Sequence, residues 1–131
     1  MKLLTLAALS VALGFGQSND CDTWEKCQEA LKAYPKSSLV QYRIGEMFFL
    51  QRNFMGAANS FRELLNGDLK PEWTEVWAHV NLGKIFDITN QRERALNEYR
   101  QALRTLDNTR GALDEAQKYI KTQYKETPST P

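Results

Sequence analysis

The sequence IGEMF at residues 44–48 recurs as LGKIF at residues 82–86. In both copies the glycine precedes an alanine by 12 residues and an aromatic residue by 16. The matched positions are Gly45, Phe48, Ala57 and Phe61 in the first copy, and Gly83, Phe86, Ala95, Tyr99 and Ala102 in the second. A glycine inside a helix costs about 1 kcal/mol relative to alanine, so its recurrence points to a packing requirement. The pattern predicts two pairs of closely packed helices with aromatic side chains between them.

Helical periodicity extends over most of the chain, and strand-like alternation is absent. Pro35, Asn66-Gly67 and Thr89-Asn90 are typical of helix ends and turns. We therefore expect helices at about 23–34, 38–50, 54–65, 71–88, 92–106 and 110–124. The tail at 125–131 has no apolar residue to bury and is expected to be disordered.

The repeated spacing resembles the tetratricopeptide repeat, whose signature places a glycine in the first helix and an alanine with an aromatic residue in the second. A domain at 22–124 is expected, with a half repeat at 22–35, full repeats at 38–71 and 76–109, and a terminal helix at 110–124. The two glycines lie 38 positions apart, against a repeat length of about 34, which indicates four residues inserted around 67–73. The resemblance implies an all-α fold, a right-handed α-solenoid of antiparallel helix pairs with about six helices.

The first 16 residues have the features of a secretory signal peptide. Lys2 precedes the apolar run 3–16, and Gly14 and Gly16 supply small residues for cleavage after residue 16. The run is shorter than the roughly 20 residues of a membrane span, and a buried N-terminal helix is the less favoured alternative. We predict an exported protein, periplasmic or secreted, whose short N-terminal segment is 17–21.

Export changes what can be expected of Cys21 and Cys27, the two cysteines of the chain. Outside the cytosol they are able to form a disulfide. Six positions along one helix span about 9 Å, which is too far for the bond, so a disulfide requires Cys21 to precede the helix. Two free thiols, with Cys27 buried as a small apolar residue, are an equal alternative.

The charge balance excludes partners that bind through bulk charge. Lys and Arg total 17 and Asp and Glu total 16, for a formal net charge of +1. Nucleic acids and anionic membranes attract a clear basic excess, so neither is expected as a partner. Two cysteines and one histidine do not supply the ligands of a usual zinc site, and no metal or cofactor is expected.

The resemblance also implies a function. In such stacks the first helix of each pair lines a concave groove that binds a peptide or protein. The corresponding residues here are Tyr42, Glu46, Phe49, Trp77, Val80, Asn81, Lys84 and Ile88. Aromatic anchors with a polar fringe suit protein binding, although packing between neighbouring repeats explains Tyr42, Phe49 and Trp77 equally well.

We therefore expect a protein-binding adaptor or assembly factor. The alternative is a structural module that forms a homo-oligomer through terminal helix faces left uncovered, around Trp24 and Cys27 and around Tyr119 and Ile120. An enzyme is the least favoured class. His79 follows Glu75 by one helical turn, but this pair has the spacing of an ordinary ion pair, and no nucleophile or phosphate-binding motif accompanies it.

Overall fold

A computed structural model describes residues 20–127, and the signal peptide predicted at 1–16 lies outside them. Within this range the chain forms six α-helices and no strand, so the fold is all-α. The helices are α2 (Trp24–Ala33), α3 (Ser38–Leu50), α4 (Phe54–Leu65), α5 (Trp73–Ile88), α6 (Arg92–Arg104) and α7 (Ala112–Lys121), with a 3-10 turn, η2 (Thr109–Gly111), before α7.

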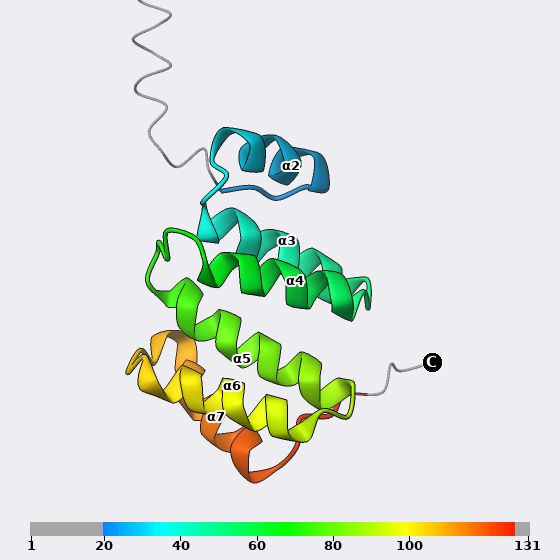
Figure 1. The fold of residues 1–131 in the computed structure, drawn as a ribbon, viewed down its shortest axis with the longest axis vertical. Coiled ribbons are helices and arrows are strands. Elements are labelled where there is room, and N and C mark those ends of the chain that lie inside the picture. Colours follow the sequence, from blue (N-terminus) through cyan, green and yellow to red (C-terminus); the bar gives the residue numbers. More distant parts are fainter. Residues whose placement is uncertain (1–19, 128–131) are drawn as a thin grey trace, which may run out of the picture.

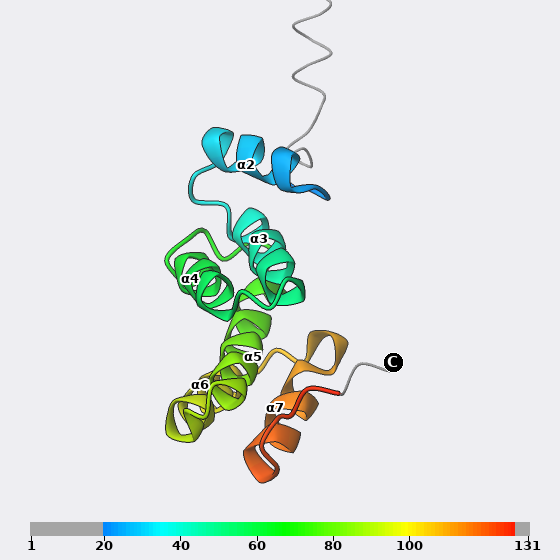
Figure 2. The same ribbon diagram turned by 90° about the vertical axis from the view of Figure 1, so that its right-hand side faces the viewer.

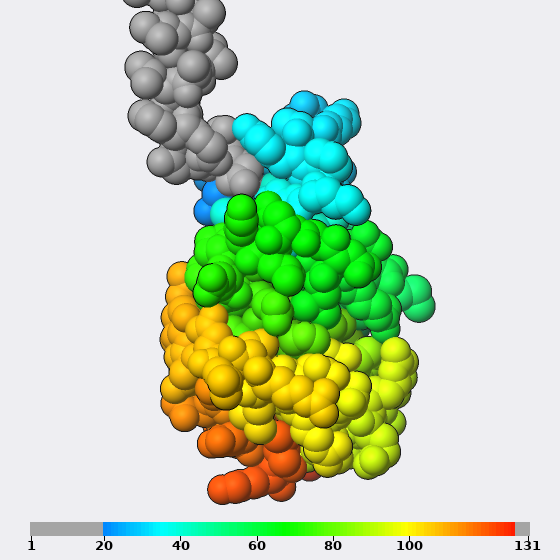
Figure 3. All heavy atoms as spheres, turned by 60° about the vertical axis from the view of Figure 1, so that its left-hand side comes forward, coloured from blue at the N-terminus to red at the C-terminus, as the bar shows by residue number. Residues whose placement is uncertain are grey.

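The helices stack in chain order along the longest axis of the molecule (Figure 1). The main contacts join α3 to α4 and α5 to α6, while α4 packs on α5 and α7 packs on α6 and α5. In the perpendicular view, α4 and α6 lie on one side of the stack and α7 on the other (Figure 2). The space-filling view likewise runs from the N-terminal part of the fold at one end to α7 at the other (Figure 3).

The repeated glycines lie where paired helices approach most closely. A Cβ atom added to Gly45 would come within 2.7 Å of the Phe61 ring, and one added to Gly83 would overlap the Tyr99 ring. Both rings are fully buried. The aromatic side chain of the second helix therefore occupies the space that the glycine of the first helix leaves open.

The connection from α4 to α5 is tied to the start of α3 by Ser38. The buried Ser38 hydroxyl donates to the Leu64 carbonyl at 2.7 Å and accepts from the Leu69 N–H at 2.9 Å. The Ser38 N–H donates to a carboxylate oxygen of Asp68 at 3.1 Å. Asp68 and Leu69, which belong to the predicted insertion around 67–73, are thus held against the start of α3.

The N-terminal helix is held by a disulfide between Cys21 and Cys27, whose Cα atoms are 5.1 Å apart. Cys21 precedes the helix cap, Thr23, as the bond requires. Cys27 is fully buried in a small cluster with Val40 and Ile44. The face expected to be uncovered around Trp24 and Cys27 is therefore covered at Cys27 by the disulfide and α3, whereas Trp24 is exposed.

The C-terminal end differs from the prediction in two respects. Helix α7 ends at Lys121, three residues before the predicted boundary. The following segment returns to α5, where the Tyr124 N–H donates to Asp87 Oδ2 at 2.9 Å and the Gln123 side-chain amide donates to the Asp87 carbonyl at 3.0 Å. Hydrogen bonds to another helix replace those that would have continued α7.

This segment also gives order to part of the predicted disordered tail. Glu126 forms an ion pair with Arg52, at the turn between α3 and α4. Tyr119 of α7 packs against both Tyr99 and Tyr124, with ring centroids 6.0 and 5.0 Å away. The face expected to be uncovered around Tyr119 and Ile120 is therefore partly buried against the chain itself, while residues 128–131 lie outside the described part.

Candidate binding groove

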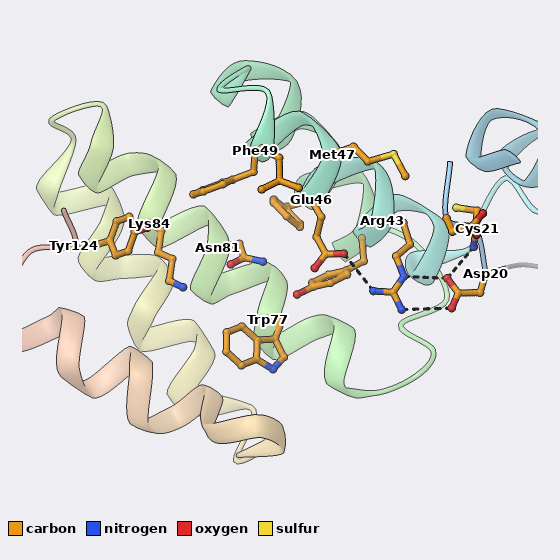
Figure 4. Close-up of a pocket in the computed structure, with 14 residues that line it drawn as sticks. Asp20, Cys21, Arg43, Glu46, Met47, Phe49, Trp77, Asn81, Lys84 and Tyr124 are labelled. Carbon is orange, nitrogen blue, oxygen red and sulfur yellow. Dashed lines mark hydrogen bonds and ion pairs between the residues drawn. The ribbon is translucent and has the colours of Figure 1, made fainter. Parts of the chain in front are cut away.

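An open groove of about 650 Å³ lies along α3 and α5, between the N-terminal segment and Tyr124 (Figure 4). Successive turns of the two helices place one face of each toward this space, because side chains three and four positions apart share a helix face. Six of the eight predicted groove residues line it, namely Tyr42, Glu46, Phe49, Trp77, Asn81 and Lys84.

Two predicted residues do not line the groove. Val80 is fully buried among the side chains of the main core. Ile88 lies one turn beyond Lys84, at the end of α5, and is only partly exposed. Val80 is adjacent to Asn81 in the sequence but about 100° around the helix from it, so the two residues face different surroundings.

The structure adds groove residues that the repeat pattern did not indicate. Arg43 lines the groove together with Asp20 from the N-terminal segment and Tyr124 from the C-terminal segment. Asp20 is 23 positions from Arg43, and Tyr124 reaches the groove because the chain leaves the α-helix after residue 121. Long-range contacts of this kind leave no local signal in one sequence.

The end of the groove next to α2 carries a three-member ionic network. Arg43 donates through Nε to Asp20 Oδ1 at 3.0 Å, through Nη2 to Asp20 Oδ2 at 3.4 Å, and through Nη1 to Glu46 Oε1 at 3.2 Å (Figure 4). The hydrogen bond from Arg43 holds the pKa of Asp20 below its usual value, so that carboxylate is ionised at neutral pH. One cation thus faces two carboxylates.

The floor of the groove is aromatic, and Tyr42 is its centre. Tyr42 makes edge-on contacts with the rings of Trp73 and Phe61, at centroid distances of 5.0 and 5.8 Å. Burial, with a smaller contribution from the negative charge of Glu46, raises the pKa of Tyr42 to about 12, and the neighbouring Asn81 side chain opposes this rise. Tyr42 therefore packs between helix pairs and also lines the groove.

At the opposite end of the groove, a second ion pair lies among aromatic rings. Lys84 Nζ lies 3.2 Å from Glu115 Oε1. It also lies 5.8 Å from the ring centroid of Trp77 and 5.3 Å from that of Tyr124, within the range of cation–π attraction. Trp77 is fixed in turn by its Nε1–H, which donates to the Thr109 carbonyl at 3.0 Å. This end of the groove is preorganised, and its cation is already paired.

His79, the candidate acid–base residue, does not line the groove. Its Nδ1 lies 2.8 Å from Glu98 Oε1, so it joins α5 to α6 instead of pairing with Glu75. Residues 20–127 contain no group of three His, Cys, Asp or Glu side chains placed to hold a metal ion. None of the helices in that range has the length and apolar character needed to cross a bilayer.

Comparison with known proteins does not assign a family or a function to this chain. No family model, curated protein or solved structure matches the chain. The chemistry of the groove is therefore the basis for assigning a function.

Proposed function

We propose that this protein is a non-enzymatic interaction module that binds a partner peptide or protein in the groove along α3 and α5, as an adaptor or assembly factor. The observation that carries the proposal is the composition of the groove, where Tyr42, Phe49 and Trp77 lie beside charged and amide side chains. Leu50 at its edge has 83% of its surface exposed. Aromatic and aliphatic anchors with a polar rim are typical of binding interfaces.

We further propose that the fold is a short tetratricopeptide-like solenoid, right-handed, in which α3 with α4 and α5 with α6 form antiparallel pairs. The matched glycines support this proposal, since Gly45 meets Phe61 and Gly83 meets Tyr99 in the same relation. The location of the groove also supports it, because α3 and α5 are the first helices of their pairs and both line it. Helix α7 then caps the last pair.

The proposed place of action is the cell envelope or the outside of the cell. The signal-like sequence at 1–16 is one basis, and the disulfide between Cys21 and Cys27 is a second. Disulfides persist in oxidising compartments and are rare in the cytosol. Intact-mass analysis of the exported protein tests both points, since cleavage after residue 16 and an oxidised cysteine pair each give a defined mass.

Self-association is the second candidate function, and the exposed aromatic side chains of the N-terminal end favour it. Trp24 is 38% exposed on α2, and Tyr34 is 40% exposed just after it. A second copy would cover them through a symmetric contact. Sedimentation equilibrium tests this alternative, because a monomer at all concentrations would exclude it.

The groove is tested by two matched substitutions of exposed apolar residues. Leu50→Gln removes an apolar side chain from the edge of the groove, and Met55→Gln removes one that is 79% exposed on α4 and lies outside it. Each form of the full chain is immobilised and exposed to an envelope extract. Wild type and Met55→Gln should retain the partner, and Leu50→Gln should lose it. Equal retention by the two variants would refute binding in the groove.

A further inference from the structure

We propose that the groove selects an extended peptide segment in which a large apolar side chain and a Lys or Arg side chain are two positions apart. This inference rests on the proposed function and adds the chemistry of the partner. It follows from the charges at the α2 end of the groove and from their distance to the apolar edge.

Carboxylates outnumber cations at the α2 end of the groove. Asp20, Asp22 and Glu46 line it together with Arg43. Arg43 binds both Asp20 and Glu46, which leaves one excess negative charge on that network. Asp22 has an ion pair with Lys26, but both side chains are mostly exposed, so this pair compensates its charge weakly. The field at this end therefore attracts a cationic side chain.

An acidic ligand finds no available partner among the lining residues. The two cations of the lining are Arg43 and Lys84, and each already holds a carboxylate, Lys84 through Glu115. Binding a ligand carboxylate would require one of these pairs to open, at the cost of leaving an uncompensated charge. Recognition of a peptide carboxylate by this groove is thus disfavoured.

Glu46 is the residue placed to receive the ligand cation. Its side chain is 43% exposed, and its Oε1 accepts the hydrogen bond from Arg43. Its Oε2 accepts no hydrogen bond from residues 20–127 and is free for an ammonium or guanidinium donor. Figure 4 shows the Glu46 side chain directed from α3 into the open space beside Asn81.

The spacing of the ligand groups follows from α3. Phe49 and Leu50 come three and four positions after Glu46, so all three lie on one face within about one helical turn of 5.4 Å. In an extended peptide, side chains two positions apart share a face and are about 6.6 Å apart. A peptide lying along α3 therefore presents an apolar group to Phe49 and Leu50 and a basic group to Glu46 when the two are separated by one residue.

A random 12-residue peptide library displayed on phage tests the inference, with the disulfide-bonded full chain as target. Sequences that also bind Leu50→Gln are subtracted, so those retained depend on the groove. We expect the retained peptides to combine an apolar residue with Lys or Arg two positions away. A synthetic representative should bind wild type at least ten times more tightly than Glu46→Gln. Glu63→Gln, an exposed substitution on α4, is the matched control and should bind as wild type does.

Each result decides a different point. Groove-dependent peptides without a basic residue, unaffected by Glu46→Gln, would overturn the inference and leave the binding module standing. A library without any groove-dependent peptide would overturn the inference, and the proposed function would fall with it only if the envelope partner were also retained equally by Leu50→Gln and Met55→Gln. A dimer in sedimentation that Leu50→Gln dissociates would show that a second copy fills the groove, and would also overturn the peptide as its occupant.

Discussion

Replacing Gly83 by alanine sets two physical effects against each other. Intrinsic helix propensity favours alanine by about 1 kcal/mol in a helix interior. The new methyl group, however, would overlap the ring of Tyr99, which is fully buried. The ring cannot move away easily, because its hydroxyl donates a hydrogen bond to Asp87 Oδ2 at 2.8 Å and Asp87 is itself buried.

We expect the steric overlap with Tyr99 to outweigh the gain in helix propensity. Overpacking a core costs about 1–3 kcal/mol, and an anchored ring places Gly83→Ala near the upper end of that range. After the gain in helix propensity, we expect the free energy of unfolding to fall by about 2 kcal/mol. Gly45→Ala should cost about 1 kcal/mol, because Phe61 has no hydrogen bond to hold its ring in place and the Cβ contact is longer, at 2.7 Å.

Urea unfolding followed by far-UV circular dichroism measures these differences. Arg100→Ala, an exposed change on α6, is the control and should lie within about 0.5 kcal/mol of wild type. A double-mutant cycle with Tyr99→Leu isolates the contact, and the cost of Gly83→Ala should largely vanish in that background. A Gly83→Ala variant as stable as wild type, or an equal cost in both backgrounds, would refute the argument.

Three further predictions concern other parts of the molecule. Asp87→Ala removes the buried acceptor of Arg92 and should lower the free energy of unfolding by about 3 kcal/mol in urea; a loss below 1 kcal/mol would contradict the assignment. Leu106→Gly should raise stability by up to about 1 kcal/mol, because Leu106 is 85% exposed and has a φ of 58°, a conformation costly for any side chain but glycine; a lower melting temperature would contradict this. The phenol of Tyr42 should ionise near pH 12, measured by absorbance at 295 nm, and Glu46→Gln should lower that pKa. Since the unfolded phenol ionises near pH 10, the stabilising contribution of Tyr42 is present below pH 10 and is lost as pH rises to 12; an unchanged phenol pKa in Glu46→Gln would argue against the charge contact.

The predicted helix boundaries agree with the structure where local chemistry sets them. Ser37 and Asn53 cap α3 and α4 through their own side chains, and Pro35 precedes the first of these caps. Such signals act over three or four residues and are readable in a single sequence. Helix α7 ends earlier than its periodicity predicts because a distant carboxylate, Asp87, accepts a hydrogen bond from the backbone of the segment that follows it.

The groove shows the same division between local and distant causes. Helical spacing was sufficient to group Tyr42 with Glu46 and Trp77 with Asn81, because residues on one face of a helix follow from the 3.6-residue period. The same spacing did not distinguish the buried Val80 from the groove residues, because buried residues occur on several sides of α5. Pairing of Arg43 with Asp20 depends on how the N-terminal segment folds back, which no periodicity encodes.

The sequence by itself determined the all-α class, the places where most helices begin and end, and the two glycines around which helices pack. These follow from propensity, capping and periodicity, which act between near neighbours. Only the tertiary structure decided that residues 20–22 and Tyr124 complete the groove, that Glu46 shares its cation with Asp20, and that Lys84 is already neutralised by Glu115. Those features join residues from separate helices and terminal segments, and the free energy that selects them arises only when the elements pack together.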